Sequence, residues 1–212
     1  MSTLLHALRR YRWQCMLASL ALIALVAAFA PLEKTLGERI RLVYFHGAWV
    51  WTGKIAFALA GLSGIAAVAL SLTRSGRASG WAEASLALGR TGLFFWLTYL
   101  PVSLLVQQIN WGGIFWDEPR WRIPAAFGVA AVLVQVALAL FDLPWLTGLI
   151  NALFGAALWM ALGRAENVLH PDSPIFNSGS ANMAGIFLVL LALSLLFMGQ
   201  FALWMRDRRP PA

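Results

Sequence analysis

The sequence predicts an all-α polytopic membrane protein, a bundle of six transmembrane helices. Composition is the first observation: 60% of the 212 residues are hydrophobic and only 12% are charged, whereas soluble domains average about one quarter charged. The second is a mean hydropathy of +0.73. The third is a series of apolar runs near the roughly 20 residues that cross a bilayer. Because no soluble or low-complexity stretch interrupts the series, residues 1–212 are predicted to form one domain.

Six apolar segments follow one another, separated by short polar connections. Their approximate bounds are 13–30, 44–72, 81–108, 123–141, 145–162 and 183–205. The first could be a signal peptide, because Ala28-Phe29-Ala30 resembles a cleavage site. We favour a retained helix, because the run is nearly long enough to span and Pro31 follows that site directly.

Two polar interruptions have expected structural roles. Lys54 lies within the second segment, and we expect its long side chain to reach outward to the lipid headgroups. Asp142-Leu143-Pro144 separates the fourth and fifth segments, and it predicts a helix start with Asp142 as cap and Pro144 in the first turn.

Charge and cysteine content narrow the possible functions. The net charge of +7 comes from sixteen Lys and Arg spread over short connections and both tails, which membrane topology and anionic headgroups explain better than nucleic acid does. The single Cys15 cannot form an internal disulfide, a CxxC pair or a CxxCH haem attachment site. A thiol-disulfide exchanger and a protein with its own covalently attached haem are therefore excluded.

Alternation of the spans groups the chemically suggestive residues. Connections one, three and five must share one membrane face, and they contain His46, the stretch 111–122 and His170 respectively. The opposite side holds nine Lys and Arg against seven on this one. The positive-inside rule therefore favours cytoplasmic amino and carboxyl ends in a bacterial-type inner membrane, with the three stretches on the external face.

Two histidines on one face could ligate a haem iron from both sides, with arginines pairing the propionates and tryptophans covering the ring. The alternative is that His46 and His170 are separate interfacial residues, and the histidines alone favour that interpretation. The loop with Trp111 and Trp116 is equally consistent with an aromatic belt and with a ligand platform. No nucleophile with a paired base, phosphate cradle or zinc-type spacing is found, so no enzyme is predicted.

Taken together, three stretches resemble the cytochrome c assembly family, the CcmC-type haem-handling membrane proteins. Arg39-Ile40 with Tyr44-Phe45-His46 and Ala48-Trp49 resembles the start of that family's second helix. Trp111-Gly112 through Trp116-Asp117 to Arg120 resembles its tryptophan-rich external loop, shortened here by a tryptophan. Asn167-Val168-Leu169-His170 with Ser173 resembles its last external loop.

The resemblance implies a haem-binding protein of cytochrome c-type biogenesis. Its candidate residues are the iron ligands His46 and His170, with Trp49, Trp111, Trp116, Asp117 and Arg120 around the haem. Haem b would be held non-covalently and transiently for a membrane-anchored haem chaperone. Subunits of an ABC-type haem-release complex and a small membrane accessory subunit would be further partners.

Two other functions remain open from the sequence. One is a structural or accessory membrane subunit that binds no haem. The other is a bis-histidine electron-transfer cytochrome, which ranks last because such a protein would prefer ligands within helices at two depths. Haem binding separates the first function from haem handling, and the redox behaviour of the haem separates the second.

Overall fold

The structure is a computed structural model that describes residues 6–7, 9–73, 75–166, 168–169 and 175–208. Within these residues the chain is helical with short connections, and it contains no β-strand. The all-α prediction is confirmed. The elements are α2 (Arg12–Ala28), α3 (Ile40–Leu72), α4 (Ala78–Trp111), α5 (Pro119–Phe141), α6 (Pro144–Gly163), the short 3₁₀ helix η1 (Phe176–Ser178) and α7 (Ala181–Asp207).

Five of the helices, α3 to α7, are long and apolar enough to cross a membrane, as a polytopic membrane protein requires. The remaining helix, α2, has 17 residues, which is about 26 Å at 1.5 Å per residue against a hydrocarbon core of about 30 Å. It ends before the predicted residue 30, and Pro31 gives the reason, because proline disfavours helical backbone at the residue before it.

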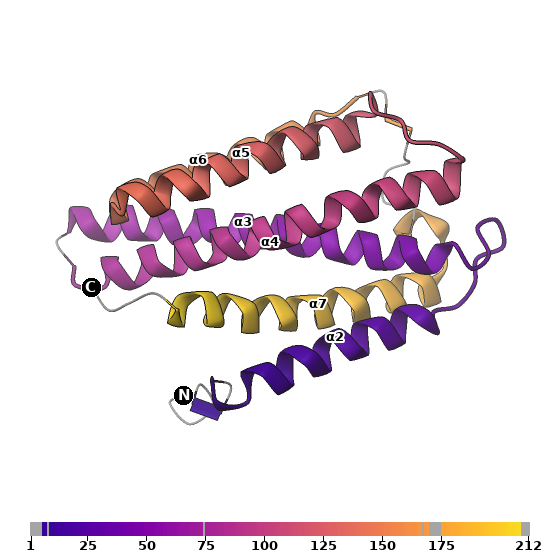
Figure 1. Ribbon diagram of the computed structural model, residues 1–212, viewed down its shortest axis with the longest axis horizontal. Helices are drawn as coiled ribbons and strands as arrows, with labels where there is room; N and C mark the ends of the chain where they lie inside the picture. Colours follow the sequence, from indigo (N-terminus) through magenta and orange to yellow (C-terminus); the bar gives the residue numbers. More distant parts are fainter. Residues whose placement is uncertain (1–5, 8, 74, 167, 170–174, 209–212) are drawn as a thin grey trace.

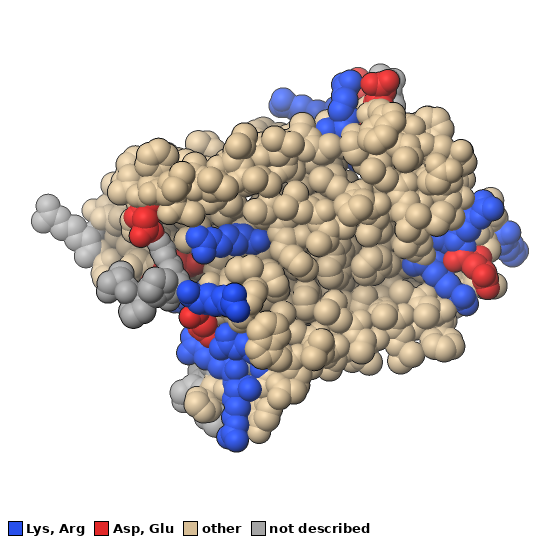
Figure 2. All heavy atoms as spheres, viewed as in Figure 1, with Lys and Arg blue, Asp and Glu red and all other residues tan. Residues whose placement is uncertain are grey.

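The helices form three layers (Figure 1). Helices α3 and α4 are the middle layer, α5 and α6 cover one side of it, and α7 with α2 covers the other. Helix α2 packs mainly against α7. On the face that Figure 2 shows, charged side chains gather toward the two ends and at the upper edge, and uncharged residues cover most of the surface between them. This distribution is what a bilayer around the bundle requires.

The connections alternate between the two ends, as predicted. Helix α2 begins where α7 ends, and there Asp207 pairs with Arg9 at 3.0 Å and with Arg12 at 2.7 Å. The connections before α3, before α5 and before α7 gather at the opposite end (Figure 1). The grouping of these three connections is therefore observed, and the membrane face that they occupy stays a prediction.

Small residues bring α3 against its neighbours. A Cβ atom added to Gly148 of α6 would lie 2.7 Å from the backbone oxygen of Gly64, so the two helix backbones touch there. A Cβ atom added to Gly53 would lie 3.3 Å from side-chain atoms of Phe95 and Trp96 on α4, so this contact is also tight. Beside the Gly64 contact, the Asn151 side chain donates to the backbone oxygen of Ser85 at 3.1 Å. Small residues and interhelical hydrogen bonds are how helices associate in lipid, where apolar burial gives no driving force.

Several helix starts differ from the sequence-based expectation, and α3 and α4 begin at Ile40 and Ala78 rather than near residues 44 and 81. Asp142 is the C-cap of α5, with φ of +45°. The N-cap of α6 is Leu143, not Asp142 as expected. The predicted position of Pro144 in that first turn is confirmed. Helix α5 begins at Pro119, earlier than residue 123, with Glu118 as its N-cap. Proline suits the first position of a helix because its missing N–H would have no partner there.

The first connection is ordered by its own carboxylate. The backbone N–H groups of Leu36 and Thr35 donate to Glu33, each at 2.7 Å. These bonds, that of Leu36 first, hold the pKa of the Glu33 carboxyl below its ordinary value. Gly37 closes the turn with φ of +54°, a conformation that favours glycine. The turn leads directly into α3 and the residues of the candidate site.

Candidate haem site

A cavity of about 360 Å³ lies at the end of the bundle where the first, third and fifth connections meet. Helices α3 and α4 extend past the ends of α5 and α6 at this end (Figure 1). The third connection, η1 and the start of α7 contribute the remaining walls. Its volume falls within the roughly 300–1,000 Å³ of small-molecule sites.

Two helices present regular faces to the cavity. The lining residues recur every three or four positions, which is the spacing of one helix face. On α3 they are Val43, His46, Gly47, Val50, Trp51 and Lys54, and on α4 they are Trp96, Tyr99, Ser103, Val106, Gln107 and Trp111. Apart from Trp111, the α4 face was missed from the sequence, although its aromatic and polar residues at helical spacing within an apolar segment were a readable signal.

His46 lies two turns into α3 and lines the cavity. Its ring centroid is 5.3 Å from that of Tyr99 on α4, with 42° between the ring planes. His46 and Gly53 lie on the side of α3 that faces the bundle, because His46 lines the cavity and Gly53 is buried against α4. An imidazole beside a largely aromatic cavity can ligate a metal centre carried by a ligand.

Lys54 does not extend outward as expected. Its Nζ lies 3.9 Å from the ring centroid of Trp51 and 4.4 Å from that of Trp159 on α6. The Trp159 indole N–H also donates to the Lys54 backbone oxygen at 3.4 Å. All three residues line the cavity. Two indole faces attract an ammonium by about 0.5–2 kcal/mol each, which explains why the charge stays beside the cavity.

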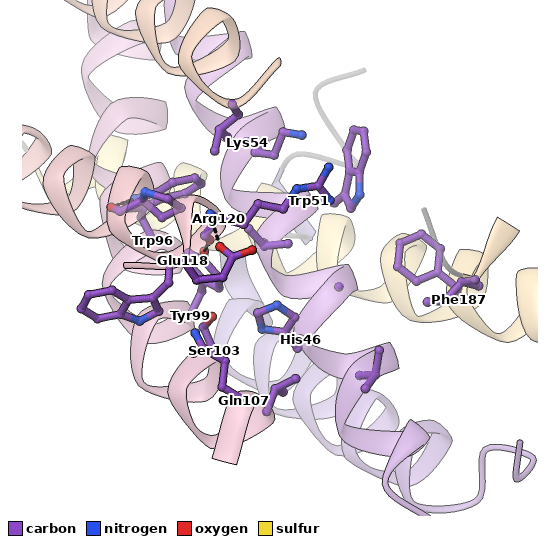
Figure 3. A pocket seen from close by; sticks show the side chains of 18 of the residues that line it. His46, Trp51, Lys54, Trp96, Tyr99, Ser103, Gln107, Glu118, Arg120 and Phe187 are labelled. Carbon is purple, nitrogen blue, oxygen red and sulfur yellow. Dashed lines mark hydrogen bonds between the residues drawn. The ribbon is translucent and has the colours of Figure 1, made fainter. Parts of the chain in front are cut away.

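Glu118 joins two connections beside the cavity. Its side chain is only 4% exposed, and one carboxylate oxygen accepts a hydrogen bond from the backbone N–H of Arg120 as the helix cap. The other oxygen accepts from the backbone N–H of Leu169 at 3.0 Å. The third and fifth connections are thereby held together. Figure 3 shows Glu118 and Arg120 between Lys54 and His46 in that view.

The third connection folds back over the end of α4. Gly112 ends the helix with φ of +72°, and the backbone N–H of Phe115 donates to Gln107 Oε1 at 2.9 Å. Tyr99 OH contacts the Arg120 backbone oxygen at 3.5 Å. These contacts hold the loop beside the cavity, so Trp111 and Arg120 of the predicted set are among the lining residues.

Three other predicted residues lie elsewhere. Trp116 is 58% exposed and makes an edge contact with Trp121, with ring centroids 5.0 Å apart. Asp117 is exposed beside it. Trp49 is 5% exposed in the core, where its indole N–H donates to Thr98 Oγ1 at 2.8 Å. None of the three lines the cavity, so the structure brings His46, Trp111 and Arg120 together and leaves these three apart.

His170 lies outside the described residues, as do Asn167 and Ser173. The described residues on either side of it are at the cavity: Leu169 bonds to Glu118, and Ile175 is a lining residue. Among the described residues, no group of three or more His, Cys, Asp or Glu could hold a bare metal ion.

Comparisons of the chain with protein-family models, with curated proteins and with solved structures find no match.

Proposed function

We propose that this protein holds haem b on the external membrane face, with His46 and His170 as iron ligands, and presents it for transfer during cytochrome c maturation. The observation that carries the proposal is the cavity itself. His46 lines a space whose other walls include indole and phenol rings, the cations Lys54 and Arg120, and the carboxylate of Glu118.

The chemistry of the lining residues fits haem. Haem is flat and largely apolar, its iron accepts imidazole, and its edge carries carboxylates. Trp111, Tyr99 and Trp96 offer aromatic surface, and Arg120 offers a guanidinium of the kind that pairs with carboxylates. Each property of haem thus has a complementary group at the cavity.

The proposed second ligand is supported by its sequence neighbour. His170 follows Leu169, whose backbone N–H bonds to the cavity residue Glu118. A histidine from the fifth connection would complement His46 from α3, which is the arrangement that the three family-like stretches imply. Transfer to a membrane-anchored haem chaperone, with ABC-type subunits and a small accessory subunit, rests on that resemblance alone.

The visible absorption spectrum of the detergent-purified protein, oxidised and reduced, tests the proposal. We expect a low-spin haem b spectrum, present on purification or formed on adding haem. The changes His46→Ala and His170→Ala should each reduce haem retention, and the double change should abolish the spectrum. His6→Ala is the matched control, because His6 is exposed near the amino end, and Cys15→Ala is a second one.

Two results would contradict parts of this proposal. Haem content that survives the double change would refute the ligand assignment. A wild-type protein that stays colourless after haem is added would instead identify a structural membrane subunit.

A further inference from the structure

Lys54 lies on a wall of the cavity with its ammonium against two indole rings. Its Nζ lies within 4.4 Å of two ring centroids, those of Trp51 and Trp159. Figure 3 shows Lys54 and Arg120 on the same side of His46. Lys54 is eight residues beyond His46 on α3, which separates their backbones by about 12 Å along the axis.

Lys54 has no carboxylate partner in the part of the chain that the structure describes. Glu118 is the one carboxylate among the described lining residues. Both of its oxygens accept backbone hydrogen bonds, from Arg120 and Leu169. An ammonium on a cavity wall, half-buried and without a protein carboxylate, is placed to pair with an anion from outside the chain.

We infer that Lys54 binds a carboxylate of the cargo and thereby makes the cavity selective for carboxylic acid macrocycles over their esters. The indole faces of Trp51 and Trp159 hold the ammonium in position, and the carboxylate accepts a charge-assisted hydrogen bond from Nζ. The inference rests on the proposed function for the identity of the cargo. It does not require an iron ligand, because Lys54 recognises the edge of the macrocycle.

A lipid phosphate is a second source of an anion at Lys54, since Trp51 and Trp159 are each 37% exposed. The cavity favours the carboxylate, because its indole and phenol lining from α4 suits a flat ring system. Neutral and anionic bilayers separate the two sources of anion.

The experiment compares iron-free protoporphyrin with its dimethyl ester. Binding is measured by quenching of tryptophan fluorescence in nanodiscs of phosphatidylcholine. We expect the wild type to bind the free acid about tenfold or more tightly than the ester, as one hydrogen bond to a charged group implies. Lys54→Gln should reduce this preference about tenfold, leaving the share that Arg120 contributes, and Lys54→Arg should keep it. Lys34→Gln is the matched control, because Lys34 is the other lysine of the chain and is exposed.

A preference that is undiminished in Lys54→Gln, or a wild type that binds acid and ester equally or binds neither, would overturn the inference. So would a preference that disappears when anionic phosphatidylglycerol is added to wild-type nanodiscs, because the lipid phosphate would then be the natural ligand of Lys54. The haem spectrum tests iron ligation, and the acid preference measured with the iron-free macrocycle tests Lys54 without iron. A wild type that shows the acid preference but no haem ligation therefore contradicts only the proposed function. A wild type that ligates haem but shows no acid preference contradicts only the role of Lys54.

Discussion

Helix phase decides which tryptophan of α3 can meet a ligand. Trp49 and Trp51 are two residues apart and so point about 200° apart around the helix. Trp49 packs in the core against Phe95, with ring centroids 4.5 Å apart. Trp51 lines the cavity and lies under the Lys54 ammonium. The sequence stretch contains both, and the resemblance points to Trp49, whereas the structure gives the cavity position to Trp51.

The same distinction separates the two tryptophans of the third connection. Trp111 lines the cavity, and Trp116 lies on the outer surface. Trp111→Ala should weaken haem retention roughly fivefold to tenfold, because loss of an aromatic wall costs about 1–1.5 kcal/mol. Trp116→Ala should have a smaller effect. The haem-to-protein ratio after size-exclusion chromatography measures both.

Equal loss in both variants would instead indicate that the loop misfolds. A larger loss for Trp116→Ala would show that the outer surface of the loop contacts the haem, as the resemblance implies.

At the scale of elements, α3 has two functions along its length. Its first half presents the cavity face from Val43 to Lys54, and its second half packs closely on α6 through Gly64 and Gly148. The close contact fixes the position of α6, and α6 contributes Trp159 to the cavity. Packing in the second half therefore positions a residue that holds Lys54 in the first.

Gly148→Val tests this helix contact. Its new Cβ would lie 2.7 Å from the Gly64 backbone oxygen, and a backbone atom cannot move aside as a side chain can. Overpacking of this kind costs about 1–3 kcal/mol, so the thermal unfolding midpoint, followed by helical circular dichroism in detergent, should fall. Gly185→Val is the control, since nothing lies within 4 Å of a Cβ at that α7 position. Equal midpoints for the two variants would contradict a close contact between α3 and α6.

The helices were predictable because apolar runs of spanning length have few alternative structures in a bilayer. The ends of the helices were less predictable than their spans. Asp142 was expected to cap α6, yet it ends α5 instead, because both roles suit an aspartate beside a turn. Glu118 was missed as a cap and as the link to Leu169, because a contact between distant connections leaves no local pattern. Lys54 was expected to reach the lipid headgroups, but it lies against two indole rings. One of these rings, that of Trp159, belongs to another helix, so no local sequence pattern indicates the contact.

At the scale of the whole molecule, the two ends of the bundle have different structures. One end joins α2 to α7 through Asp207 and its two arginines, and Arg206 pairs with Glu83 at 3.2 Å. The other end contains the cavity and the three connections that surround it. Any ligand of the cavity is therefore exchanged on one membrane face, and the function depends on which face that is.

Cysteine labelling in intact cells determines this face. In a Cys15→Ala background, single changes Thr35→Cys and Asp117→Cys lie in the first and third connections, and Ser79→Cys lies in the first turn of α4 at the opposite end. All three positions are exposed. A membrane-impermeant maleimide should label Thr35→Cys and Asp117→Cys from outside, and Ser79→Cys only after lysis, because the arginine excess favours a cytoplasmic location for the Ser79 end.

Labelling of Ser79→Cys alone would put the cavity on the cytoplasmic face and rule out external presentation of haem while leaving the fold intact. Labelling of Thr35→Cys and Asp117→Cys from different sides would contradict the helix arrangement itself.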